Sequence, residues 1–172
     1  TVYEWETMSV LANINVGVYP SCLDATNEYV VVGCQFSDYI YIIDVDNFTI
    51  VDSIPAFEQP CKVHIDPISN RAFVASDIDD VCMVIDLQNL TIVDTIQDFP
   101  IYLQTFSWST QSSRNWIKYS DFLITPDGNG LIVHNGQDKI LYFDIATGNI
   151  SKQTTVLSAR GIAFSGDGTI IV

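Results

Sequence analysis

The chain alternates apolar and polar residues in short runs, and one pair of such runs recurs along it. Tyr39–Ile54 reads YIYIIDVDNFTIVDSI, with an alternating segment on either side of an Asp-rich turn. This is the pattern of a half-buried β-hairpin. Related copies occupy Thr1–Val16, Val81–Ile96 and Lys139–Val156. A hairpin that recurs at a spacing of roughly 40 residues predicts a repeat architecture built from short strands.

Each complete copy of this hairpin follows two further short strands, so the repeating unit has four strands. Pro60–Ile96 and Asp121–Val156 repeat the strand order of the first complete unit. Turn residues such as the PDGNG segment separate the strands. The strands of the first complete unit are expected at Ser21–Ala25, Tyr29–Gly33, Tyr39–Asp44 and Thr49–Ile54.

The two ends of the chain carry complementary halves of the unit. Thr1–Val16 supplies the outer two strands, whereas Ser158–Val172 supplies the inner two. We therefore predict an all-β fold: a β-propeller of four-stranded antiparallel blades, with about four blades and one blade split between the termini. The predicted segments of this single domain are an outer half-blade at 1–16, blades at 18–57, 58–98 and 119–156, an inserted loop at 99–118 and an inner half-blade at 157–172.

Open strand edges pair readily with other strands, which leaves three arrangements for the two half-blades. They close with each other in one chain, they close with neighbouring copies in a head-to-tail filament, or the chain is a piece of a longer propeller. The sequence does not decide between these arrangements. We expect protein partners or self-association at the half-blade edges.

The repeat also resembles a known family. Arg71–Ile96, RAFVASDIDDVCMVIDLQNLTIVDTI, resembles the YVTN-type β-propeller repeat, in which a "YVAN" strand leads to "VSVID" and "TVVxTI" strands. Phe122–Ile150 and Gly161–Val172 are similar to the same repeat with its "SPDG" turn, and only Ile101–Lys118 falls outside the resemblance. The resemblance implies the fold, a surface-layer or secreted protein of archaea or bacteria, and kinship with lactonase-type propellers. It implies little about activity.

The chain is acidic, with seven Lys and Arg residues against 21 Asp and Glu residues and a net charge of −14. Such a field repels phosphate backbones, so we expect no nucleic-acid partner. No apolar run approaches the roughly 20 residues of a membrane-spanning helix, and no signal peptide stands in this sequence. The acidity and the many Thr, Ser, Asn and Tyr residues favour an extracellular or cell-surface location.

Three Asn-x-Ser/Thr sequons, at Asn47, Asn89 and Asn149, stand at the outer turns of the three complete units. A turn on the rim of a propeller is accessible to a glycosyltransferase, so N-linked glycans are expected there if the protein is exported. The alternative is that Asn suits the turn and Thr suits the strand that follows it.

An acidic residue ends the third strand of each unit: Asp44, Asp86 and Asp144, with Glu4 in the same register of the N-terminal half. A carboxylate at this point accepts hydrogen bonds from turn amides, so we predict a structural role. A shared Ca²⁺ site would need six to eight converging oxygens, whereas these carboxylates are spread over separate blades. We therefore expect no cofactor and no metal, and Ca²⁺ stays an unsupported alternative.

Four cysteines, Cys22, Cys34, Cys61 and Cys82, fit no zinc-binding spacing. Their places at the starts and ends of strands put all four toward one face of a propeller. An even number on one face is compatible with two disulfides in an exported protein, and we favour the blade-to-blade pairs Cys22–Cys61 and Cys34–Cys82. Four buried thiols packed as small apolar groups are the alternative.

The segment Ile101–Lys118 is longer than a usual connection and carries the aromatic residues Tyr102, Phe106, Trp108 and Trp116. Connections in compact domains usually run about 2–6 residues, and longer ones often carry function. We consider two roles for these aromatics. They fold back as a satellite cluster, or they form an exposed interaction loop, including an aromatic platform for carbohydrate.

Catalytic signatures are weak. Neither histidine, His64 or His134, stands in a His and carboxylate cluster or beside a recognisable nucleophile, and the sequence has no phosphate loop, dinucleotide fingerprint or nucleophile elbow. We therefore expect a non-enzymatic extracellular module for structure and protein interaction, able to assemble into a filament or lattice. The alternatives are a lactonase-like enzyme with a cation in the central channel and a carbohydrate-binding module that uses residues 101–118.

Overall fold

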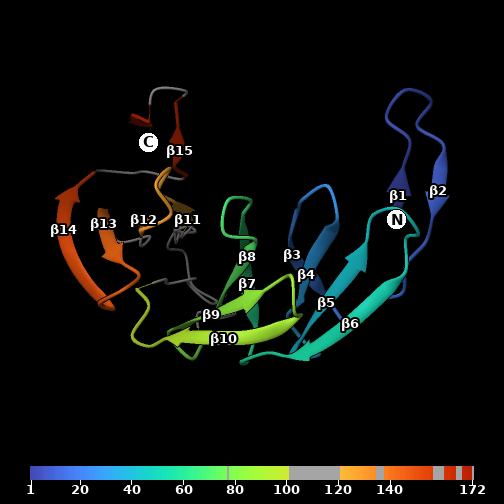
Figure 1. Ribbon diagram of the computed structural model, residues 1–172, viewed down its shortest axis with the longest axis horizontal. Helices are drawn as coiled ribbons and strands as arrows, with labels where there is room; N and C mark the ends of the chain where they lie inside the picture. The colour runs from blue at the N-terminus through green and yellow to red at the C-terminus, as the bar shows by residue number, and fades with distance from the viewer. Residues whose placement is uncertain (77, 101–120, 135–137, 157–160, 166–167, 172) are drawn as a thin grey trace, which may run out of the picture. The chain divides into compact units, whose positions relative to one another are not determined.

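The computed structural model describes residues 1–76, 78–100, 121–134, 138–156, 161–165 and 168–171 (Figure 1). All regular structure in these ranges is β-strand, with sixteen strands in five sheets. The predicted all-β fold with several four-stranded antiparallel sheets is confirmed. No helix in this part of the chain is long and apolar enough to cross a bilayer.

The chain divides into two compact units, Thr1–Thr95 and Ile96–Val172. The first unit contains one hairpin and two four-stranded sheets, each with its strands in sequence order. The hairpin pairs β1 (Val2–Tyr3) with β2 (Val10–Ala12). The first sheet consists of β3 (Pro20–Ala25), β4 (Tyr29–Cys34), β5 (Tyr39–Asp44) and β6 (Ile50–Pro55). The second sheet consists of β7 (Pro60–Asp66), β8 (Arg71–Ser76), β9 (Val81–Asp86) and β10 (Thr91–Ile96).

The second unit contains one four-stranded sheet and one hairpin. The sheet consists of β11 (Asp121–Ile124), β12 (Gly130–His134), β13 (Lys139–Asp144) and β14 (Asn149–Thr155). The hairpin pairs β15 (Ala163–Phe164) with β16 (Ile170–Ile171). The strands therefore fall where the repeat places them, whereas the division of the whole chain into one domain with fixed blade boundaries stays a prediction.

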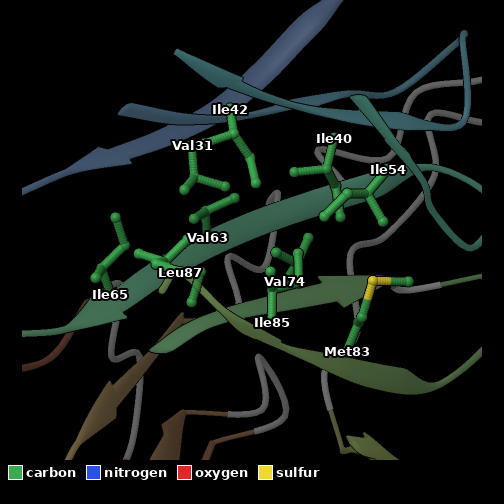
Figure 2. Packing of buried hydrophobic residues seen from close by; sticks show 11 residues of the cluster. Val31, Ile40, Ile42, Ile54, Val63, Ile65, Val74, Met83, Ile85 and Leu87 are labelled. Atoms are coloured by element: carbon green, nitrogen blue, oxygen red, sulfur yellow. The ribbon is translucent and has the colours of Figure 1, made fainter. Parts of the chain in front are cut away.

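The alternating pattern has the consequence that it predicts. Successive side chains of a strand point to opposite faces of its sheet, so Ile40 and Ile42 of β5 share one face with Val31 of β4. In Figure 2, Val63 of β7 lies next to Val31 and Ile42, and Ile40 lies beside Ile54; all of them belong to one buried cluster with Ile85 of β9. The other face of the first sheet carries Val32, Cys34 and Ile43, against which Ile14 and Val16 pack.

Packing between the first two sheets forms the main core of the first unit. Its buried members come from three strands of each sheet. Burying apolar surface between two sheets contributes about 25 cal/mol of stabilising free energy per Å². The buried residues of this cluster are Val31, Ile40, Ile42, Ile54, Val63, Ile65, Ala72, Val74, Met83, Ile85 and Leu87.

The turn between the third and fourth strands of a sheet is set by the repeated aspartate. In the first sheet, Asp44 Oδ1 accepts a hydrogen bond from the backbone N of Asn47 at 2.8 Å. Asp144 Oδ1 accepts the same bond from Thr147 at 2.8 Å. The left-handed residue that closes the turn has a φ of 54° at Phe48 and 69° at Gly148. The predicted structural role of these carboxylates is confirmed.

Candidate functional site

The β1–β2 hairpin repeats the outer turn of a complete sheet. The backbone N of Glu4 donates to the carbonyl of Ser9 at 2.9 Å, and the backbone N of Met8 donates to the carbonyl of Glu4 at 2.8 Å. Asp44 and Phe48 make the same two bonds in the first sheet, at 2.9 and 3.0 Å. The hairpin is therefore built as a pair of outer strands, with Glu4 in the place of the repeated aspartate.

This register shows which side chains of the hairpin lack cover. Counting from Glu4 and from Asp86, Tyr3 corresponds to Ile85, and Trp5 corresponds to Leu87. Ile85 and Leu87 are fully buried between the two complete sheets, whereas Tyr3 is 56% exposed and Trp5 is 82% exposed. Contiguous patches of exposed apolar side chains mark interaction surfaces, and Tyr3 and Trp5 are candidates for such a patch.

A groove in the second unit shows the matching deficit. It lies between the β11–β14 sheet and the β15–β16 hairpin and has a volume of about 560 Å³. Ile132, Ile140 and Tyr142 line it from the sheet, and Phe164 and Ile170 line it from the hairpin. We call this space the β13–β16 groove. Its lining is mostly apolar, as expected of a surface that packs against another strand.

The corresponding space between the two complete sheets is filled. The sheet pairings match Ile40 to Ile140 and Ile42 to Tyr142. Ile40 and Ile42 belong to one buried cluster with Val74, Met83 and Ile85 of the second sheet, and the cavity beside Ile40 and Met83 measures only about 10 Å³. Within the described residues, β15 and β16 form a two-stranded sheet.

Both surfaces carry charged side chains. Lys152 of β14 and Asp127 line the groove, and the Lys152 Nζ lies 5.2 Å from the centroid of the Tyr142 ring. Glu4 and Glu6 lie on the exposed β1–β2 turn. Rim charges of this kind contribute more to the orientation and rate of association than to affinity.

A second candidate site combines an acid and an imidazole in the first unit. Asp24 of β3 and His64 of β7 occupy the same register position in adjacent sheets, opposite Val31 and Phe73. Asp24 Oδ2 lies 3.2 Å from His64 Nδ1 and accepts a hydrogen bond from the backbone N of Ile65 at 2.8 Å. The backbone N of Ala25 donates to Asp24 Oδ1 at 2.8 Å. Backbone amides of both sheets therefore hold the carboxylate.

This pair lines a polar pocket of about 600 Å³, together with Asn27, Glu28 and Asn70. A carboxylate that accepts from Nδ1 orients the imidazole and favours the tautomer with its proton on that nitrogen. The arrangement can therefore support acid–base chemistry. The sequence indicated His64 but not its partner. The pair could have been predicted by aligning the repeats, because Asp24 and His64 stand at equivalent positions in the first strands of adjacent sheets.

The three sequons do not all occupy the same position. Asn47 and Asn89 are exposed within their turns, and their Nδ2 atoms donate to Asp44 at 3.1 Å and to Asp86 at 2.9 Å. Asn149 instead begins β14, because Thr147 takes the turn position. The third sequon is therefore shifted by two residues along the turn, although its Asn is also exposed. Glycosylation stays a prediction.

The predicted disulfides are not formed, and all four cysteines are thiols. Cys34 faces the Ile14 side of the first sheet, away from the second sheet, so it cannot meet Cys82. The thiol of Cys61 donates to the carbonyl of Ala75 at 3.2 Å. Burial raises the pKa of Cys22 to about 11, and it also raises the pKa of Cys82. Buried thiols of this kind are the alternative that the sequence left open.

Other predicted features yield less. No group of three or more metal-ligating side chains occurs in the described ranges. The interaction loop with Tyr102, Phe106, Trp108 and Trp116 lies outside the described residues, and of His134 only its place in β12 is described.

Comparisons with known proteins bear on the fold. No family model and no curated protein matches the sequence. A solved structure of Kuenenia stuttgartiensis hydrazine synthase is similar, with a TM-score of 0.70 and 20% sequence identity. The match covers 96% of this chain and 46% of that chain, so this chain spans less than half of its length. At this identity the likeness shows the fold alone.

The comparison corrects one expectation. We predicted that the chain is not an enzyme, whereas a chain of similar fold belongs to an enzyme. The expectation rested on weak catalytic motifs in the sequence. Because this fold occurs in an enzyme, the fold does not support the argument that the chain lacks activity. Strand register also brings Asp24 and His64 together, although they are far apart in the sequence.

Proposed function

We propose that this chain is part of a β-propeller that serves as a protein-interaction module, in which strand edges and uncovered blade faces make the contacts. The observation that carries the proposal is the exposure of Tyr3 and Trp5 at positions whose counterparts, Ile85 and Leu87, are buried in a complete sheet. In a propeller of YVTN type, β1–β2 would supply the two outer strands of a blade and β15–β16 the two inner strands of a blade.

The thermodynamics of small sheets support this reading. A two-stranded sheet is marginally stable in water by itself and needs further strands or a packed face. Each hairpin is therefore expected to gain strands from elsewhere. The other end of the chain, a second copy and a further stretch of propeller are the three sources that the repeat leaves open.

The outermost strands add a second contact surface. Ile50 and Val51 of β6 are partly exposed, as are Ile92 and Val93 at the equivalent places in β10. An edge strand with exposed β-branched residues is a template for pairing or packing with other chains. Repetition of the pair in two sheets suits a surface that meets an extended partner or a lattice.

The proposed location is the outside of the cell. A net charge of −14 and exposed sequons at Asn47, Asn89 and Asn149 support a secreted or surface-bound glycoprotein. Glycans at the turns would leave the β13–β16 groove open, because none of the three Asn residues lines it.

Cross-linking on intact cells tests this function. Cells that produce the chain are treated with a membrane-impermeant amine cross-linker, and products are mapped by mass spectrometry. We expect Lys139 and Lys152 to be labelled and cross-linked to other protein chains, with glycan mass on Asn47 or Asn89. Absence of labelling contradicts the location. Labelling without any intermolecular cross-link contradicts the interaction role.

A second candidate function rests on the Asp24–His64 pair. Its convergence in one pocket with Glu28 is the feature that an enzyme acting by acid–base chemistry requires. NMR of the imidazole nitrogens tests it, since the chain has only two histidines. Asp24→Asn should change the tautomer balance of His64 and leave His134 unchanged. An unchanged His64 spectrum would remove the basis for this candidate, and metal analysis of the purified chain tests the version with a cation.

A further inference from the structure

The β13–β16 groove and the β1–β2 hairpin are complementary parts of one interface. The groove presents Ile140 and Tyr142 where the first sheet presents Ile40 and Ile42. The hairpin presents Tyr3 and Trp5 where the second sheet presents Ile85 and Leu87, which are buried in one cluster with Ile40 and Ile42. A known, filled interface within the molecule therefore gives the geometry that the two open surfaces would adopt together.

We propose that the β13–β16 groove binds the β1–β2 hairpin of a second copy of this chain. The hairpin adds to β16 as β9 adds to β8, and it sets Tyr3 and Trp5 over Ile140 and Tyr142. Each copy then presents one groove and one hairpin, so association proceeds head to tail. This inference rests on the proposed interaction function and names the partner for its main surface.

The chemistry of the occupant comes from the groove. Ile132, Ile140, Phe164 and Ile170 give it an apolar lining, and Lys152 and Asp127 are its charged lining residues. The β1–β2 hairpin offers the exposed apolar side chains of Tyr3, Trp5 and Met8, whose exposures are 56, 82 and 71%. Glu6 follows Trp5 and has the charge opposite to that of Lys152, whereas Asp127 of the groove has the same charge as Glu6. Large aromatic residues that enter an apolar pocket dominate the binding energy of such interfaces.

Complementary variants of the full chain test the proposal. The hairpin variant carries Tyr3→Asp and Trp5→Asp, and the groove variant carries Lys152→Glu and Ile170→Asp. All four sites are exposed or at the groove rim, so each variant is expected to fold, which far-ultraviolet circular dichroism verifies. Matched controls place Asp on exposed sites elsewhere, with Ile68→Asp in the first unit and Ile150→Asp in the second.

Light scattering after size exclusion gives the readout. We expect the wild-type chain and both controls to exceed the monomer mass of 19.2 kDa as concentration rises. Each complementary variant alone should stay monomeric, with its dissociation constant raised at least about 30-fold, as loss of an interface hot spot implies. An equimolar mixture of the two variants should form a dimer, since one intact hairpin and one intact groove remain.

Charge reversal gives a finer test. Glu6→Lys should weaken association about 2- to 5-fold, and Lys152→Glu in the same chain should restore it. A wild-type chain that is monomeric at every concentration overturns the inference, and so does a monomeric mixture of the two variants. If that chain still forms cross-links to other proteins on cells, the interaction function stands and only the choice of a second copy fails. A monomer destabilised by Trp5→Asp would assign the groove to the chain's own hairpin.

Discussion

The first two sheets pack tightly against each other, whereas the β11–β14 sheet and the β15–β16 hairpin leave a groove between them. Between the first and second sheets, Ile40 is fully buried, and a cavity of about 10 Å³ remains beside it. In the second unit, the equivalent Ile140 lines a groove of about 560 Å³. Ile40 and Ile140 occupy the same register position on the third strand of their sheets. They differ in what packs beside them, which includes Val74 and Met83 of the second sheet in the case of Ile40.

The comparison distinguishes apolar surfaces that stabilise the fold of a repeat protein from apolar surfaces that are available for binding. An apolar surface that is packed against another sheet stabilises the chain, whereas we propose that the groove in the second unit binds a partner. Tyr3 and Trp5 are exposed at positions whose counterparts in the second sheet are buried.

The largest contrast is between Leu87→Ala and Trp5→Ala in dilute solution. Leu87 is fully buried, so its truncation should lower the free energy of unfolding by about 3 kcal/mol. Trp5 occupies the equivalent place at 82% exposure, so its truncation should change this free energy by less than about 0.5 kcal/mol. Urea unfolding monitored by circular dichroism measures both. Equal losses would show that Trp5 is covered within its own chain.

The floor gives a smaller contrast. Ile40→Ala should lower the free energy of unfolding by about 4 kcal/mol. Ile140 is 7% exposed and belongs to a smaller buried cluster with Ile132 and Ile162, so Ile140→Ala should lower it by about 3 kcal/mol. Both residues are Ile on the third strand of a sheet, so the chemistry of the substitution is matched. Ile150→Ala on the exposed strand β14 serves as control. A larger loss at Ile140 than at Ile40 would contradict the assignment of an open groove.

Thiol labelling compares the same regions without measuring stability. Only the thiolate reacts, and with a pKa of about 11 the thiol of Cys22 is roughly 0.1% ionised at pH 8. Cys82 is also buried, with its pKa raised by burial, so both should react slowly. A cysteine placed at the groove by Ile170→Cys should react at least about tenfold faster. Fast labelling of Cys82 in the native chain would mean that the β9 cover opens readily.

The smallest effect concerns the turn that complete sheets and hairpin share. A hydrogen bond from the Asn89 side chain, with help from the Gln88 backbone, lowers the pKa of Asp86. A lowered pKa stabilises the fold above the unfolded-state pKa, and this contribution is lost as pH falls through the folded-state value. The melting temperature of Asp86→Asn should therefore fall slightly less than that of the wild type between pH 6 and pH 3. An identical pH dependence would show that the turn bond contributes nothing.

The fold was predictable because its signals are local and repeated. The alternation in Tyr39–Ile54 fixes which face of a strand is buried, and the copies fix the strand order. The Asp44 turn was also predictable, since a carboxylate three residues before a turn amide can reach it. These features depend on short sequence separations.

The candidate sites were less predictable because they depend on long-range register. Asp24 and His64 are forty residues apart, and only the pairing of two sheets brings them to 3.2 Å. The disulfide prediction was wrong because placement at strand ends does not tell which face of the sheet a thiol points to, and Cys34 points away from the second sheet. The groove depends on how the β15–β16 hairpin packs against the β11–β14 sheet, which the local pattern around Ile140 does not determine.

The central claim is that the β1–β2 hairpin of one copy covers the β13–β16 groove of another. Isotope-filtered NMR on mixed samples tests it most directly, with one copy labelled at Ile methyl groups and the other protonated at aromatic rings. We predict intermolecular nuclear Overhauser effects from Tyr3 and Trp5 to the Ile140 methyl groups, and none to those of Ile40. Absence of any such effect to Ile140 at concentrations where the chain has associated would contradict the claim.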